Sequence, residues 1–248
     1  MASKNFRVQS TYETFQTLYN AITTARPFIY SRYGDGDFNV MVSGHDDSSQ
    51  VASMPLAIEL ADLLIDESPN NLVGICMHEK EPGMEPGLLE GWDNPIFVDW
   101  VNEYCVGREF YNAIALHYYC ICKSLDMRHF LFQLRKVPNK IFVGSISREL
   151  VESVLGPLEH YIPTEDVDCY NNIEQWWPEV AAATSKSGLV IGAAGLSTRA
   201  MNQRLLVAGF EGQSLDLGST LDFLIGNENR TWITMAGPMA RRRVLCNV

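Results

Sequence analysis

Asp35 and Asp37 are the residues whose type and spacing most directly indicate chemistry in this sequence. They alternate with Gly34 and Gly36 and follow the apolar residues 27–30 closely. Two carboxylates one residue apart repel each other unless a cation lies between them, and Mg²⁺ and Mn²⁺ take oxygen ligands of this kind. A glycine backbone can approach a phosphate closely because it has no Cβ. These residues therefore predict a divalent cation, Mn²⁺ or Mg²⁺, beside a phosphorylated ligand.

The position of these carboxylates depends on the segment that precedes them. Residues 27–30 form a short apolar run between a proline and a glycine-rich stretch, which predicts a buried strand. Carboxylates that follow such a strand lie at its C-terminal edge, where open α/β sheets bind their ligands.

A second candidate for anion binding follows the apolar residues 189–192. Gly195 precedes Ser197 and Thr198, and we expect one of these two to cap a helix that continues to Val207. The first N–H groups of such a helix point outward at the positive end of its dipole and suit a phosphate. Taken alone, the pattern also fits a plain strand-to-helix turn. Residues 144–147 repeat it more weakly.

Two parts of the chain resemble a known family. Residues 31–38 resemble the R-[FY]-G-D-G-E signature of the GT-D glycosyltransferases. Residues 192–218 are similar to the late segment of that family, in which a Gly-Pro-Thr-type loop opens a helix and the next strand ends in Asp-[IL]-Gly-His. The resemblance implies a metal-dependent glycosyltransferase that takes its sugar from a nucleotide-diphosphate sugar, with UDP as one expected nucleotide.

The resemblance and the residue types together define a candidate site. The expected catalytic residues are Asp35, Asp37 and Asp216, of which Asp35 and Asp37 also bind the metal. Asp216 is expected to orient a sugar hydroxyl or to act as a base. The expected ligand-binding residues are Arg32, Gly34, Gly36, Gly195, Ser197 and Thr198. Arg32 either neutralises the diphosphate or pairs with Asp35.

The sequence departs from the family pattern at two positions. Asp37 stands where the family usually has Glu, which shortens the arm that reaches the metal. Ser219 stands where the family often has His, so any role of that imidazole is absent or is supplied by another residue.

The acidic segment is also compatible with other kinds of site. Asp35, Asp37 and Asn39 alternate as in a calcium loop, but Val40 and Asp46 stand where an EF-hand has Gly and Glu. A β-turn with exposed acids is a further possibility. A phosphohydrolase with Asp35 as nucleophile uses the same carboxylates, and a non-catalytic nucleotide-binding module needs only the phosphate contacts.

Composition limits the class of protein. The chain has 248 residues, 46% of them hydrophobic, which is enough for one α/β domain over residues 1–248 with a substantial core. A net charge of −11 opposes sequence-independent binding to nucleic acid. The basic residues 241–243 are expected to be solvated.

Cysteine spacing and hydropathy predict a cytoplasmic protein. The six cysteines form no C-x-x-C pair, which argues against a structural zinc site or a disulfide framework. The first residues lack the apolar core of a secretory signal, and no apolar run is long enough to span a membrane. The acceptor is left open among a protein glycan, a lipid-linked sugar and a modified nucleobase, and the sequence does not specify the oligomeric state.

The order of the expected elements predicts the fold class. Strands and helices alternate along the chain, which predicts a single Rossmann-like α/β domain with a mostly parallel sheet and helices on both faces. Residues 108–118 are expected to be helical and residues 232–235 to form a late strand. Residues 78–87 are expected to form a surface loop or a lid, and the tryptophans at 92, 176 and 177 to pack or to stack on a ligand ring.

Overall fold

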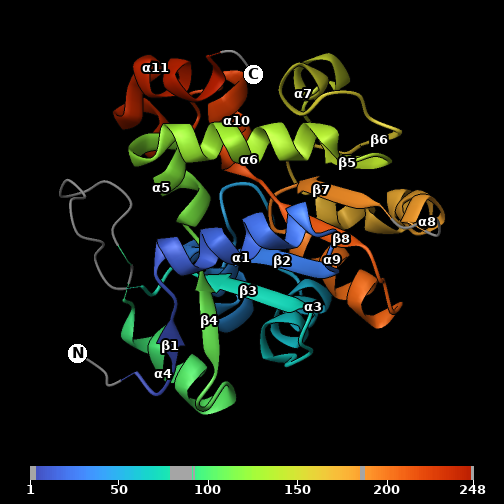
Figure 1. Cartoon of the computed structure of the whole chain (residues 1–248). Helices are drawn as coiled ribbons and strands as arrows, with labels where there is room; N and C mark the ends of the chain where they lie inside the picture. The colour runs from blue at the N-terminus through green and yellow to red at the C-terminus, as the bar shows by residue number, and fades with distance from the viewer. Residues whose placement is uncertain (1–3, 79–90, 92, 185–187, 247–248) are drawn as a thin grey trace.

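The computed structural model describes residues 4–78, 91, 93–184 and 188–246 (Figure 1). Its centre is an eight-stranded sheet with the order β1-β4-β3-β2-β8-β7-β5-β6, in which all paired strands are parallel. The parallel sheet expected from the sequence is thus confirmed. The strands are β1 (Arg7–Val8), β2 (Phe28–Tyr33), β3 (Asn71–Ile75), β4 (Glu109–Asn112), β5 (Lys140–Gly144), β6 (His160–Pro163), β7 (Leu189–Ala193) and β8 (Gln213–Asp216).

Helices cover both faces of the sheet, as expected (Figure 1). One face packs against α3 (Met54–Ile65), α4 (Pro95–Tyr104), α8 (Ile173–Thr184) and α9 (Ser197–Val207). The other face packs against α1 (Thr11–Thr23), α5 (Ala115–Cys122), α6 (Ser124–Lys136), α7 (Arg148–Leu155), α10 (Ser219–Ile225) and α11 (Thr231–Leu245).

Strand β2 is the central element because its side chains fill both cores. Ile29 and Tyr33 belong to the core on the α3 face, whereas Phe28 and Tyr30 belong to the core on the α1 face. Successive side chains of a strand point to opposite faces, so an apolar run without alternation is what a strand buried on both faces requires. All six residues of β2 are buried.

Local sequence signals account for the start of several helices. Ser10 caps α1 and forms a capping box with Glu13, in which Ser10 Oγ accepts from the Glu13 N–H and Glu13 accepts from the Ser10 N–H. Ser53 caps α3 through the Leu56 N–H, and Pro55 lies in the first turn, where its missing N–H costs no hydrogen bond.

Two local expectations are wrong. Residues 109–112 form strand β4 rather than part of a helix, because Phe110 and Asn112 face inward while the strand pairs with β3. Residues 232–235 belong to α11, where Trp232 stacks on side chains of α5 and α10. Both segments are only four residues long, and periodicity alone assigns such short segments poorly. The acidic segment forms a short helix, α2 (Asp35–Phe38), followed by the π-helical turn η1 (Asn39–Ser43).

Candidate active site

A crevice opens where the chain leaves β2 and β8 in opposite directions. β2 leads through α2 to α3 on one face, whereas β8 leads to α10 on the other face. Such a point at the carboxyl ends of parallel strands is the usual ligand site of an open α/β sheet. A pocket of about 280 Å³ lies there, lined by residues that follow β2, β3, β4, β7 and β8.

Asp37 is buried against Arg199 of α9. Its Oδ1 lies 3.0 Å from Arg199 Nε, and its Oδ2 accepts hydrogen bonds from Arg199 Nη2 at 3.1 Å and from the Gly34 N–H at 2.8 Å. Burial raises the pKa of Asp37 to about 6, although the nearby Arg199 guanidinium and the Gly34 N–H both act to lower it. The carboxylate is therefore committed to a partner within the protein and is not an exposed acid.

Arg32 is held by Asp216 at the end of β8. Arg32 Nη2 lies 3.2 Å from Asp216 Oδ1 and donates to the Leu217 carbonyl at 2.9 Å, while the Arg32 N–H donates to Asp216 Oδ2. A Cβ at Gly218 would collide with this guanidinium, so the close approach requires glycine there. Arg32 therefore pairs with Asp216 and not with Asp35.

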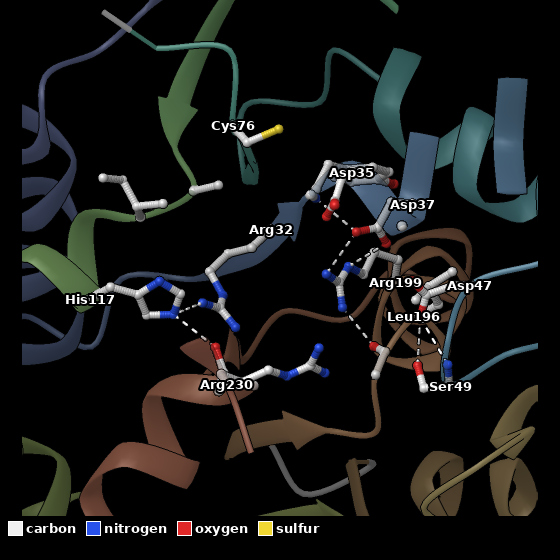
Figure 2. Close-up of a pocket in the computed structure, with 18 of the residues that line it drawn as sticks. Arg32, Asp35, Asp37, Asp47, Ser49, Cys76, His117, Leu196, Arg199 and Arg230 are labelled. Carbon is white, nitrogen blue, oxygen red and sulfur yellow. Dashed lines mark hydrogen bonds and ion pairs between the residues drawn. The ribbon is translucent and has the colours of Figure 1, made fainter. Parts of the chain in front are cut away.

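Three guanidinium groups point toward the same part of the pocket (Figure 2). Asp216 links two of them, since its Oδ2 also lies 3.5 Å from Arg199 Nη1. Arg230, from the segment before α11, is the third and is exposed. Among the residues that the structure describes, Arg230 makes no side-chain hydrogen bond or ion pair within 4.0 Å, so its charge is the one most available to an anion. Arg199 and Arg230 are not predictable from the sequence, because no motif marks either residue.

His117 of α5 closes the other end of the pocket. Its Nε2 lies 2.8 Å from Arg32 Nη1 and 3.1 Å from Ser219 Oγ, and its ring stacks on Trp232 with centroids 4.3 Å apart. Guanidinium only donates hydrogen bonds, so Nε2 is the acceptor and the proton of the neutral ring is on Nδ1. Burial, with a smaller contribution from Arg32, lowers the pKa of His117 well below its usual value. An imidazole thus lies beside Ser219 and comes from a different element.

Asp35 differs from Asp37 because it is exposed at the pocket wall. Asp47 approaches the same helix so closely that a Cβ at Gly36 would collide with its carboxylate. Within the described part of the chain, no group of three or more His, Cys, Asp or Glu side chains is arranged to hold a metal ion.

The structure brings together most of the residues predicted from sequence. The residues of the candidate site that line the pocket are Arg32, Gly34, Asp35, Gly36, Asp37 and Gly195. Asp216, Ser197 and Thr198 are buried and lie outside the lining. The N–H groups of Ser197 and Thr198 donate to the Ala194 and Gly195 carbonyls, and α9 has Leu196 at its N-cap. The expected cap is therefore wrong, since Thr198 Oγ1 accepts instead from the Ala194 N–H.

The remaining sequence candidates lie elsewhere. Trp176 is buried in the core and Trp177 packs beside Arg204, so neither lines this pocket. Residues 79–87 and Trp92 lie outside the described residues. All six cysteines are free thiols. None of the described helices is both long enough and apolar enough to cross a membrane.

Comparison with known proteins identifies the fold. The chain is similar in structure to a glycosyltransferase (DUF1792) from Streptococcus sanguinis, with a TM-score of 0.65 and 16% identity over 91% of this chain and 87% of the other. A second structure, of a domain of unknown function 1792 with a distinct glycosyltransferase fold, gives a TM-score of 0.60 and 16% identity over 86% and 78%. No protein-family model and no curated protein matches the sequence. The fold expected from the resemblance to GT-D glycosyltransferases is confirmed.

Proposed function

We propose that the protein is a glycosyltransferase that binds a nucleotide-diphosphate sugar in the crevice between β2 and β8. The observation that carries this proposal is the convergence of Arg32, Arg199 and Arg230 on one pocket (Figure 2). Guanidinium groups bind phosphate oxygens with paired, charge-assisted hydrogen bonds. The glycosyltransferase fold of the structural neighbours supports the class of reaction.

We further propose that Asp35 binds a divalent cation, Mn²⁺ or Mg²⁺, together with the diphosphate. The residues fit such an ion, because Asp35 offers an exposed carboxylate and Mg²⁺ is usually bound by one or two carboxylates plus substrate phosphates. We propose Asp37 as the second carboxylate ligand of this cation, after its contact with Arg199 is released. When bound, the cation would offset charge on the leaving diphosphate.

The protein's own residues have separate roles in this proposal. Arg230 and Arg199 contact the diphosphate, and Arg32 adds a fixed positive charge. Asp216 acts as a positioning residue, since it holds Arg32 and Arg199 and does not line the pocket. The neutral His117 accepts a hydrogen bond from Arg32 and so fixes the direction of that guanidinium.

Thermal-shift measurements with UDP, GDP, CDP and dTDP, each with and without Mn²⁺, test the proposal. A ligand that binds only the folded state stabilises it by about 2.7 kcal/mol at 100 times its Kd. We expect at least one nucleotide to raise the Tm, with a larger rise in Mn²⁺. Asp35→Asn should remove the Mn²⁺-dependent part, and Asp62→Asn, at an exposed position of α3, should not.

Arg230→Gln tests the anion contact. Loss of a charge-assisted hydrogen bond costs about 1.5–3 kcal/mol, which weakens nucleotide binding about 10- to 100-fold. The matched control is Arg26→Gln, at an exposed arginine outside the pocket. If no nucleotide diphosphate binds, or if Arg230→Gln binds as the parent does, the donor site is misassigned.

A further inference from the structure

A second cavity, of about 510 Å³, lies at the same edge of the sheet as the nucleotide pocket. Its walls come from the segments that follow β5 and β6 and from α7 and α10, which lie close together in Figure 1. Because all the strands are parallel, their carboxyl ends share this edge. The cavity therefore neighbours the pocket assigned above to the nucleotide and lies over the ends of β5 and β6, two strands that the nucleotide pocket does not use.

Helix α10 connects the two cavities. Ser219, its first residue, lines the nucleotide pocket, and Asp222, one turn later, lines the second cavity. Residues three apart lie on the same side of a helix. The charge of Asp222 also interacts with Arg230 and Arg32, both of which line the nucleotide pocket. A ligand in the second cavity is thus close to one in the first.

The polar lining of the second cavity matches a polyhydroxylated ligand. Asp166 accepts a hydrogen bond from Ser145 Oγ at 3.0 Å, and Asp222 accepts one from Asn227 Nδ2 at 3.1 Å. These contacts orient the two carboxylates, and each carboxylate keeps lone pairs for further donors. Sugar hydroxyls are such donors. Ser145 belongs to residues 144–147, the weaker copy of the strand-to-helix pattern at residues 195–198.

The rest of the lining fits a sugar better than a phosphorylated ligand. Three apolar side chains, Ile146, Leu150 and Ile225, form part of the wall and can pack against the C–H face of a sugar ring. Such a mixture of apolar surface and a few oriented polar groups is typical of small-molecule sites. Among the described residues that line this cavity none is basic, which disfavours a phosphorylated acceptor.

We infer that this second cavity binds the acceptor and that the acceptor is a neutral carbohydrate. The role of acceptor rests on the proposed glycosyltransferase function. The binding of a neutral sugar rests on the cavity alone. It assigns Asp166, Asp222 and Asn227 to the acceptor and leaves the arginines to the donor.

Ser147→Trp tests the inference by filling the cavity. Ser147 is exposed, lines the cavity and makes no side-chain capping bond at the start of α7, so the change removes no stabilising contact. The matched control is Ser153→Trp, on the same helix but outside this cavity. Asp166→Asn removes the charge of one carboxylate without blocking the space.

Saturation-transfer NMR with methyl β-glucoside, methyl β-galactoside and methyl N-acetyl-β-glucosaminide measures sugar binding directly. We expect transfer to at least one glycoside from the parent and from Ser153→Trp, a several-fold weaker signal from Asp166→Asn, and none from Ser147→Trp. Absence of transfer to all three, or transfer that Ser147→Trp leaves unchanged, overturns the inference. The Tm rise induced by the nucleotide that binds the parent should persist in Ser147→Trp, so failure of the donor site and failure of this site give different results.

Discussion

At the scale of single residues, two buried carboxylates hold two of the three pocket arginines in place. Asp37 holds Arg199, and Asp216 holds both Arg199 and Arg32. The charges inside this network are partly balanced before any ligand binds. Arg230 stands outside it, so the network fixes the geometry of the site while Arg230 contributes charge that an anion can use.

The Asp37–Arg199 pair predicts that metal binding depends on the nucleotide. Both oxygens of Asp37 face Arg199, so Mn²⁺ alone should bind weakly, and a diphosphate that attracts Arg199 should strengthen Mn²⁺ binding. Arg199→Gln should free Asp37 and allow Mn²⁺ to bind without a nucleotide. The electron paramagnetic resonance signal of free Mn²⁺ measures this binding. Arg204→Gln, on the same helix, is the control, and tight Mn²⁺ binding by the parent without nucleotide would contradict the prediction.

Replacement of Asp216 should strongly reduce the stability of the folded protein and should affect metal binding less. It is fully buried between Arg32 and Arg199, and removing one partner of a buried ion pair costs about 3–5 kcal/mol because the other charge is left uncompensated. We expect Asp216→Ala to lower the free energy of unfolding by roughly this amount in urea titrations. Glu174→Ala, which breaks an exposed pair with Arg204, should cost about 1 kcal/mol or less. Equal effects of the two changes would show that Asp216 is not structurally central.

At the scale of elements, the sequence predicts what local pattern encodes and misses what distant contacts decide. Strand β2 follows from an apolar run and is confirmed, and the start of α1 likewise has a local cause in the capping box of Ser10 and Glu13. The acidic segment is helical because the Gly34 N–H is capped by Asp37 and the turn packs against Arg199, which is distant in sequence. The position of His117 beside Ser219 likewise depends on a contact between residues that are distant in sequence. A single sequence does not show which helices meet at the crevice.

The junction of α5, β2 and α11 predicts an acid-sensitive stability. His117 is buried between Arg32 and Trp232, and its pKa in the folded protein lies well below the usual 6.5. Below pH 6.5 the unfolded chain therefore binds a proton that the folded protein does not, so this group lowers stability as the pH falls, by up to about 1.4 kcal/mol per pH unit.

His117→Gln keeps an acceptor for Arg32 but cannot take up a proton. The free energy of unfolding of this variant should fall less between pH 7 and pH 5 than that of the parent. Urea titrations at several pH values measure the difference, with His129→Gln on the surface of α6 as the control for losing a histidine. The raised pKa of Asp37, about 6, makes the folded protein more stable as the pH falls from about 6 toward the usual pKa of an aspartate. This contribution is the same in variant and parent, so it cancels when the two are compared. A steeper fall in His117→Gln would contradict the assignment.

At the scale of the whole molecule, the two cores are joined through one sheet, which predicts cooperative unfolding. Alternate residues of β2 enter different cores, so neither core can persist once the sheet is lost.

Leu60 lies in the core on the α3 face and Leu131 in the core on the α1 face, and both are fully buried. Leu→Ala at either position should cost about 2–5 kcal/mol. If the molecule unfolds as one unit, each change should shift the far-ultraviolet circular dichroism and tryptophan fluorescence transitions together and by equal amounts. Two separate transitions, or a change in one core that moves one probe alone, would show that the two faces unfold independently.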